Sequence, residues 1–447
     1  MVTRKLAEFV SNTSYQDIPE EIKEHSKLIF LDWLGVTLAG SREEIGSVMM
    51  RLIDEVDGGM GPAHATVIGK GFKTDVLNAA LANGSMSHAL DLDDYHAPTL
   101  CHPAAAFLPC VFAMTEYKKL GGKDLITAMT VAFEIMIRVG LGARRIHYDR
   151  GWHATSTLGK FGATAGAGKI LGLSVEGLVN AFGLAGTQAG GLRQVFGTMG
   201  KPFHAGKASM DGALSALLAQ KGFECSKEII EGENGFMQLF SDDPDIEKIL
   251  DRLGDYYYLP TVSFKPYASC GATHSTIDIM KELRKREDID VENISEIVLE
   301  AGKIVIEAAG KSSPKTGLEG KFSTYYCAAV ALAEGAASPD KFTDEKVNDP
   351  RLVELRKKVK INIPESDLGF GVNAVIRMKD GTEYRASTKA PKGDPENPIS
   401  YDELTEKFRG VTKEVIPGGN VEKLIEYIKD LEEVKDMRTI ADLCAPK

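Results

Sequence analysis

The sequence predicts a mainly α-helical protein with a large helical domain and a smaller α+β domain. In the first two-thirds of the chain, apolar residues recur at helical spacing. The near-continuous β-branched runs that a parallel α/β sheet requires are absent there. After about residue 256, short segments instead alternate between apolar and polar residues, as half-buried strands do. These patterns disfavour a doubly wound α/β fold.

The first predicted helix begins after Pro19, and apolar residues recur along it until Gly40. Further helices are predicted at approximately 75–90, 104–118, 124–141, 154–171, 174–189 and 205–222. Many of these segments are rich in Ala and Gly, as in Gly-Ala-Thr-Ala-Gly-Ala-Gly at 162–168. Small residues let helix backbones approach closely, so we expect these helices to be central and buried.

Strands are predicted in the later part of the chain at 294–300, 359–363, 372–378 and 383–387. Asp380-Gly381 supplies a hairpin turn between the last two. Helical segments at 275–286 and 323–334 lie between the strands, which is typical of an α+β domain. Two short helices at 401–408 and 421–431 end the chain. They could form a third domain, but two short helices cannot bury a core alone, so a return to the helical domain is favoured.

Composition excludes several classes of function. The chain has 53 Lys and Arg against 64 Asp and Glu, a net charge of −11, whereas a general nucleic-acid binder needs a basic footprint. The longest uncharged run, Tyr95 to Thr115, is interrupted by prolines and histidines, and no secretory signal is visible, so we expect no membrane association. Six cysteines without paired spacing fit reduced thiols in a cytoplasmic protein.

Cofactor and metal signatures are weak. Residues 162–169 lack the spacing of a phosphate loop, and Gly166-Ala-Gly168 lacks the third glycine of a dinucleotide fingerprint. No H-E-x-x-H or Cys/His ligand spacing appears. The acidic cluster at 91–94, with His96, could bind a divalent metal or could be a capped helix end with solvated acids. We expect no cofactor and no bound metal.

Basic and imidazole side chains gather at four predicted helix starts. Between residues 95 and 210 there are twelve Lys or Arg against five Asp or Glu. The side chains at the helix starts are His102, His153, Lys201, His204, Lys207, Lys265 and His274. A helix start exposes unpaired N–H groups and a positive dipole end, which bind anions. Each residue alone could be a cap or an interface group, but together they indicate a pocket for a substrate with several carboxylates.

Such a pocket suits proton chemistry. A proton next to a carboxylate is weakly acidic, so its removal needs a positioned base and cations that stabilise the enolate-like charge. A histidine at a helix start stays neutral because the dipole lowers its pKa, and it can then accept a proton. Lysines or a second histidine could stabilise the anion or protonate a leaving hydroxyl.

Several motifs resemble those of the MmgE/PrpD family. The segment 82–94, Ala-Asn-Gly-Ser-Met-Ser-His-Ala-Leu-Asp-Leu-Asp-Asp, followed by His102-Pro103, is similar to a hallmark of that family. Further similar motifs follow in the same order at 151–155, 162–165, 201–206, 265–270 and 321–326. The resemblance runs through essentially the whole chain.

The resemblance implies a large all-helical domain from residues 1–258 and 396–447, a smaller α+β lid domain at 259–395, and a homodimer. It implies cofactor-independent lyase or isomerase chemistry in a cleft between the domains. Catalytic roles are expected for His102, His153, Asp91 and Tyr326, and substrate-binding roles for Lys201, Lys265, His204, Lys207 and His274. The histidines His102 and His153 are the first choices for proton transfer, whereas His204, Lys207 and His274 could equally pack or support the site.

The activity expected from this resemblance is that of a dehydratase or decarboxylase of a small hydroxy or unsaturated di- or tricarboxylate, similar to 2-methylcitrate dehydratase. An epimerase using the same site and a non-catalytic small-acid binding protein are the alternatives. Tyr95 stands where family members often carry threonine, which predicts a reshaped pocket. Gly271 stands where some members carry arginine, which predicts one carboxylate anchor fewer.

Overall fold

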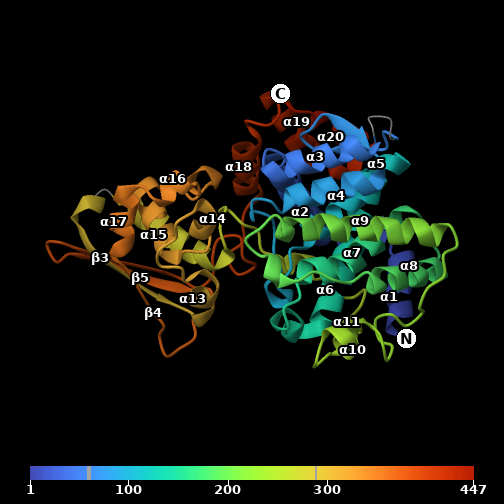
Figure 1. The fold of residues 1–447 in the computed structure, drawn as a ribbon, viewed down its shortest axis with the longest axis horizontal. Coiled ribbons are helices and arrows are strands. Elements are labelled where there is room, and N and C mark those ends of the chain that lie inside the picture. The colour runs from blue at the N-terminus through green and yellow to red at the C-terminus, as the bar shows by residue number, and fades with distance from the viewer. Residues whose placement is uncertain (58–61, 287–288) are drawn as a thin grey trace. The chain divides into compact units, whose positions relative to one another are not determined.

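The computed structural model describes residues 1–57, 62–286 and 289–447, which form two compact units (Figure 1). The first unit comprises Met1–Ser263 and Ser400–Lys447, and the second comprises Phe264–Ile399. The first unit is therefore built from both ends of the chain, and α18 (Tyr401–Thr412) packs against α2 (Glu20–Gly40).

The first unit is mainly helical, as the sequence predicts. Its other helices are α1 (Val2–Asn12), α3 (Glu44–Asp57), α4 (Val76–Ser87), α5 (Pro103–Lys118), α6 (Gly122–Asp149), α7 (Ala154–Ile170), α8 (Val175–Thr187), α9 (Gly200–Gln220), α10 (Phe236–Phe240), α11 (Ile246–Leu250), α19 (Gly418–Lys429) and α20 (Arg438–Leu443). The alanine- and glycine-rich helices α5 and α7 are buried along nearly their whole length, which confirms their predicted central position.

Helices α4 and α9 pack closely against each other. A Cβ atom added at Gly84 would lie 2.6 Å from the Cα of Gly206, so only glycine permits this approach. The contact brings the carboxyl-terminal end of α4 close to the first turns of α9, and the candidate site lies at these two helix ends.

Helix α6 is long and apolar enough to cross a membrane by length and composition, but 94% of its most apolar window is buried inside the structure. Its buried Arg138 pairs with Glu134, 3.0 Å away, and donates hydrogen bonds to the carbonyls of Asp251 and Tyr256 at 2.7 Å. These contacts tie α6 to the chain that follows α11. Helix α6 is thus a core helix.

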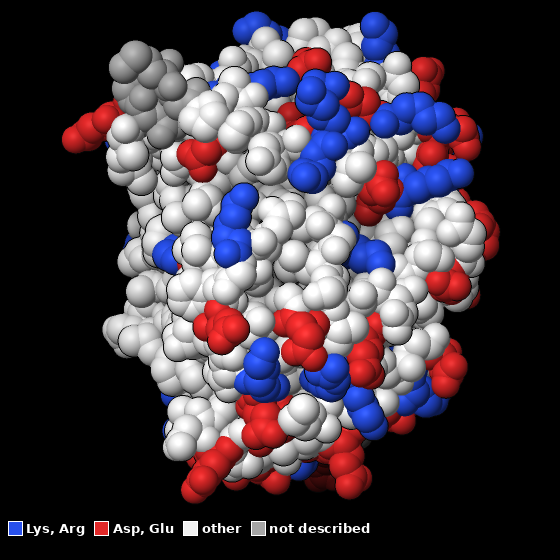
Figure 2. Space-filling model, turned by 90° about the vertical axis from the view of Figure 1, so that its right-hand side faces the viewer, with Lys and Arg blue, Asp and Glu red and all other residues white. Residues whose placement is uncertain are grey.

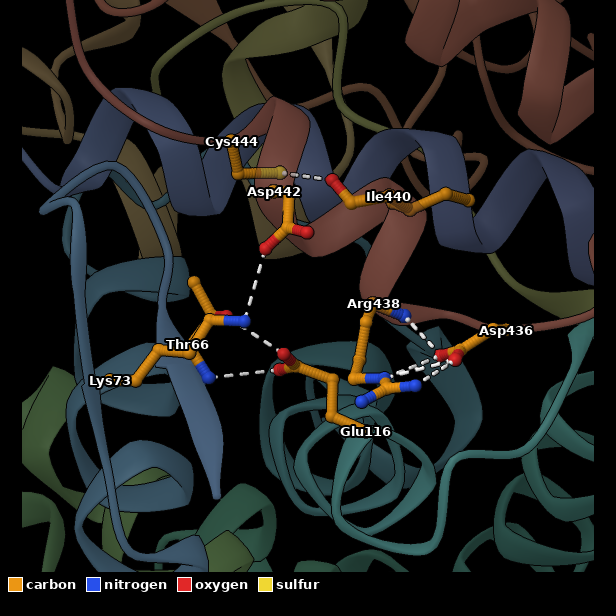
Figure 3. Close-up of polar contacts among 8 residues, drawn as sticks. All are labelled: Thr66, Lys73, Glu116, Asp436, Arg438, Ile440, Asp442 and Cys444. Carbon is orange, nitrogen blue, oxygen red and sulfur yellow. Dashed lines mark hydrogen bonds and ion pairs between the residues drawn. The ribbon is translucent and has the colours of Figure 1, made fainter. Parts of the chain in front are cut away.

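A short hairpin in this unit was not predicted. Strands β1 (Ala65–Val67) and β2 (Phe72–Thr74) pair antiparallel, and each is too short to show an alternating pattern. Glu116 of α5 holds the hairpin, because its carboxylate accepts hydrogen bonds from the backbone N–H and the hydroxyl of Thr66 (Figure 3). Lys73 of β2 pairs with Asp442 of α20 at 3.0 Å, which connects the hairpin to the end of the chain.

The second unit contains a four-stranded sheet of order β4–β3–β5–β6. The strands are β3 (Ile294–Ala301), β4 (Val359–Asn362), β5 (Val372–Met378) and β6 (Glu383–Thr388), each within one residue of its predicted bounds. β3 pairs with β4 in parallel and with β5 antiparallel, and β5 and β6 form the predicted hairpin, whose Gly381 has φ of +90°. The helices are α12 (His274–Arg284), α13 (Lys303–Ala309), α14 (Gly317–Gly320), α15 (Thr324–Glu334), α16 (Asp344–Val347) and α17 (Pro350–Lys357).

The molecular face in Figure 2 carries charges of both signs. Lys and Arg side chains are interspersed with Asp and Glu, and they do not form a continuous basic surface there. This distribution agrees with the net charge of −11 and offers no extended footprint for a nucleic-acid backbone on that face.

Candidate active site in the helical unit

Two helices of the first unit begin at predicted site histidines. His102 is the N-cap residue of α5 and His153 is the N-cap residue of α7, which confirms that both stand at helix starts. Pro103 occupies the first turn of α5, where its missing N–H is not needed. The backbone N–H of His102 donates to the hydroxyl of Thr155 at 3.0 Å, and this bond joins the two helix starts.

The turn after α4 places a carboxylate between two imidazoles. Asp93 is 1% exposed, and its Oδ2 lies 2.8 Å from Nδ1 of His88 and 3.2 Å from Nδ1 of His102. Burial opposes ionisation of Asp93, but the charge interactions with His88 and His102 outweigh it and hold its pKa well below the usual value. The ionised carboxylate therefore lies between the two imidazole rings.

Asp94 and the C-terminal segment hold this turn in place. Asp94 accepts a hydrogen bond from the backbone N–H of Ala104, in the first turn of α5, at 3.1 Å. Burial, then Asp93 and Asp32, raise the pKa of Asp94 well above its usual value. Lys407 of α18 pairs with Asp32 at 2.5 Å and donates to the carbonyl of Leu92 at 2.9 Å. The acidic turn is therefore fixed by α2, α5 and α18 together.

Lys201 reaches this turn from α9. Its Nζ lies 2.6 Å from Oδ1 of Asp91, and both side chains are about one-seventh exposed. Asp91 has φ of +55°, an uncommon left-handed conformation for a non-glycine residue. Helix α9 begins at Gly200 and not near residue 205, so the motif at 201–207 lies inside the first two turns and does not precede the helix. Pro202 permits this earlier start, because proline is tolerated in a first turn.

His204, one turn along α9 from Lys201, contacts His153 directly. The two Nδ1 atoms are 2.9 Å apart, and the ring of Phe196 lies edge-on to His153 with centroids 4.9 Å apart. Burial, then His88 and Lys201, hold the pKa of His153 well below its usual value. Burial and then Lys160 lower the pKa of His204 to about 4. Both imidazoles are therefore neutral at pH 7.

Lys207 is engaged one turn further along the helix. Its ammonium pairs with the carboxylate of Asp211, which also pairs with the buried Lys160 at 2.8 Å. Lys207 is thus placed next to an internal ion-pair cluster, with Asp211 as its ion-pair partner. Its predicted role in substrate binding stays a prediction.

The donor atoms around Asp93 could also hold a metal ion. His88, Asp91, Asp93 and His102 each offer one ligand atom, and these atoms lie within 4.8 Å of one another. Two imidazoles and two carboxylates suit a divalent transition metal. However, the ammonium of Lys201 already lies against Asp91 and supplies a positive charge there. A metal ion and Lys201 would therefore compete for the carboxylate of Asp91.

Three predicted site residues belong to the second unit. Lys265 is 3% exposed, and His274 begins α12 with its Nε2 3.1 Å from the carbonyl of Ser269. The phenol of Tyr326 donates to the carbonyl of Lys341 within the unit. Burial raises the pKa of Tyr326, so this side chain is a protonated phenol at neutral pH. The roles of Lys265, His274 and Tyr326 stay predictions.

Five of the nine predicted site residues thus gather in the first unit: Asp91, His102, His153, Lys201 and His204. The predicted catalytic and substrate-binding residues did not include His88 or Asp93, although both lie in the motif at 82–94. The imidazole of His88 lies between the other two rings of the cluster. The distance between ring centroids is 4.4 Å to His102 and 6.0 Å to His153. Only the turn geometry after α4 shows which carboxylate meets which imidazole.

The chain belongs to the MmgE/PrpD family. The MmgE/PrpD N-terminal domain matches residues 4–249 and the MmgE/PrpD C-terminal domain matches residues 267–433. The two matches together span most of both units.

Characterised relatives are similar along nearly their entire length. Cis-aconitate decarboxylase of Aspergillus terreus is 28% identical over 99% of this chain and 95% of the relative. Cis-aconitate decarboxylase of Homo sapiens is 26% identical over 99% of this chain and 94% of the relative. The mitochondrial 2-methylcitrate dehydratase of Yarrowia lipolytica is 25% identical over 95% of this chain and 86% of the relative. These relatives are lyases, and their names specify small carboxylic acids.

Proposed function

We propose that this chain is a cofactor-independent lyase, either a dehydratase or a decarboxylase, that acts on a small hydroxy or unsaturated di- or tricarboxylate. The observation that carries the proposal is the clustering of three imidazoles and an ammonium around two carboxylates in the first unit. The activities named for the relatives support it, since both remove a group from a small polycarboxylate.

His102 and His153 are the two proposed proton carriers, and either ring can act as the base. Asp93 lies 3.2 Å from Nδ1 of His102, and Nε2 of that ring would accept a proton from the carbon next to a substrate carboxylate. In the reverse sense the same nitrogen can deliver a proton to the carbon that loses carbon dioxide. A buried, ionised carboxylate behind the imidazole also stabilises the imidazolium that forms during transfer.

Lys201 and the helix starts are proposed to stabilise negative charge. The ammonium of Lys201 is partly exposed and pairs with Asp91, so a substrate carboxylate can share it. The N-terminal turns of α5, α7 and α9 bring their positive dipole ends to the same region. Together these groups would stabilise the enolate-like charge that develops when a proton or carbon dioxide leaves.

Other roles rest on the sequence resemblance. Substrate-binding roles for Lys265 and His274, a catalytic role for Tyr326 and assembly as a homodimer are proposed on that basis. Substitution of each residue separately, and light scattering after size-exclusion chromatography, test them independently of the cluster in the first unit.

Incubation of the purified full chain with cis-aconitate and 2-methylcitrate tests the proposal. Proton NMR in real time should show conversion of one acid, with carbon dioxide or water as the second product. His102→Gln should reduce kcat at least about 100-fold, which is the typical loss of a general base. The control His64→Gln removes an exposed histidine outside the cluster and should retain normal turnover.

An epimerase is the second candidate, because His102 and His153 have separate partners, Asp93 and His204, and could act as two distinct proton carriers. Deuterium exchange at carbon without loss of a group would identify an epimerase and would contradict the lyase. A rise in thermal unfolding temperature with no turnover of any acid would identify a binding protein instead.

A further inference from the structure

The contact between His153 and His204 constrains protons as well as positions. Two neutral imidazoles whose Nδ1 atoms lie 2.9 Å apart form a hydrogen bond only if one Nδ1 carries a hydrogen and the other does not. Because each neutral ring carries one N–H, the choice at Nδ1 also decides which ring has a bare Nε2. The tautomers of the two histidines are therefore coupled.

We propose that His153 and His204 form a two-imidazole proton relay, in which His204 is a positioning residue that sets the tautomer of His153 and exchanges protons with solvent. The relay rests on the proposed function, since His153 is its reacting end. His153 is 1% exposed, whereas His204 is only partly buried on α9, so the pair extends from the interior toward water.

Every proton that moves along the relay has a donor and an acceptor. When Nε2 of His153 takes a proton from carbon, the C–H bond breaks and its electron pair stays on the substrate. The Nδ1 hydrogen of His153 then passes to Nδ1 of His204, and the Nε2 hydrogen of His204 leaves to water. In decarboxylation, a C–C bond breaks, its electrons stay on the substrate, and the same steps in reverse bring a proton from water to carbon.

The groups around His153 and His204 disfavour a protonated, positively charged form of either ring. Burial and then Lys160 disfavour a lasting imidazolium at His204, and burial, then His88 and Lys201, disfavour one at His153. Lys160 itself is fixed by Asp211 at 2.8 Å. Phe196 lies edge-on to His153 and limits the directions open to its ring. A proton that reaches the pair is therefore passed on.

NMR of the free protein tests the shared proton without any substrate. Protein labelled with 15N-histidine should show a coupling across the hydrogen bond between the two Nδ1 nuclei, with signals assigned by His153→Gln and His204→Gln. One Nδ1 should be protonated and the other bare. Two bare Nδ1 atoms, or no coupling in the unsubstituted protein, would overturn the relay.

Kinetic measurements then test whether the relay takes part in the reaction. Glutamine can hydrogen bond to His153 but cannot carry a proton, so His204→Gln should lower kcat roughly 10- to 100-fold with little change in KM. Added imidazole should restore activity to His204→Ala, a response that a packing residue would not give. The control His64→Ala should be normal and unresponsive to imidazole.

The two proposals fail separately. An unsubstituted protein that turns over no acid would contradict the proposed lyase, while the NMR coupling would still report the shared proton. Turnover that persists unchanged in His204→Gln, in a protein that shows the coupling, would overturn the relay and leave the lyase standing.

Discussion

Lys201 and Asp91 form an ion pair, with 2.6 Å between Nζ and Oδ1, that joins the first turn of α9 to the turn after α4. The pair holds the ammonium in place before any acid arrives. An arriving carboxylate gains an oriented cation but must share it with Asp91. Binding strength at this position is therefore set by a competition between two carboxylates.

Removal of the ammonium should weaken binding more than it slows chemistry. We expect Lys201→Ala to raise KM about 10-fold or more, because one charge-assisted contact to substrate is lost while the imidazoles remain. Steady-state kinetics measure this. Lys221→Ala, at the exposed carboxyl-terminal end of α9, is the matched control and should behave normally. Equal KM values in the two variants would remove Lys201 from substrate binding.

Loss of His153 should abolish most turnover without unfolding the protein. His153→Ala removes the reacting imidazole, and we expect kcat to fall by roughly three orders of magnitude. Circular dichroism should stay unchanged, since the backbone N–H of His153 still donates to the carbonyl of Gly191. Near-normal turnover in a folded variant would exclude His153 from the reaction.

Protonation of the His153–His204 pair should occur well below the ordinary histidine pKa. Burial and Lys160 lower the pKa of His204 to about 4, and the pKa of His153 is also lowered. Both rings therefore stay neutral as pH falls through 6.5. NMR of 15N-histidine-labelled protein at a series of pH values measures the midpoint of each ring. A midpoint near 6.5 for His204 would contradict the neutral pair.

Glu116 should make stability depend on pH. Burial raises its pKa to about 7, while hydrogen bonds from Thr66 oppose the shift. A raised folded-state pKa contributes stability that is present below the unfolded value near 4.5 and is lost as pH rises through 7, up to about 3 kcal/mol. Urea unfolding of the unsubstituted protein and of Glu116→Gln at pH 5 and 8 should show a smaller pH effect in the variant. If the free energy of unfolding changed equally with pH in both proteins, Glu116 would not be the source of the pH dependence.

Chelation should leave activity intact. The ligand atoms of His88, Asp91, Asp93 and His102 lie within 4.8 Å of one another, but Lys201 supplies the positive charge beside Asp91. Dialysis against EDTA followed by elemental analysis should give an active protein with no stoichiometric metal. Activity that disappears on dialysis and returns with a divalent cation would establish a metal centre in place of the proposed cluster.

Local patterns in the sequence predicted most regular elements. Alternation gave the four strands of the second unit, and Asp380-Gly381 gave the hairpin turn, because both signals are contained in short segments. The hairpin β1–β2 was missed because three-residue strands carry too little alternation. The helix predicted at 205–222 starts earlier, at Gly200, and Pro202 lies within its first turn.

The sequence predicted several of the residues that gather at the site, but it did not predict which of them are in contact with one another. His102 and His153 were identified because both precede helix starts. The pairing of Asp93 with His88 and His102, and of His153 with His204, depends on how α4, α5, α7 and α9 pack. The glycine contact between Gly84 and Gly206 that permits this packing joins residues 122 positions apart, which no local pattern reports.

Lys407 of α18 pairs with Asp32 and donates a hydrogen bond to the carbonyl of Leu92, and this has a consequence for the synthesis of the protein. Lys407 leaves the ribosome only after the whole second unit has been translated, so the acidic turn stays unlocked throughout that interval. The second unit, whose sequence is continuous, can complete its core first. The contacts that fix the acidic turn can therefore form only after residues that follow the second unit have been translated.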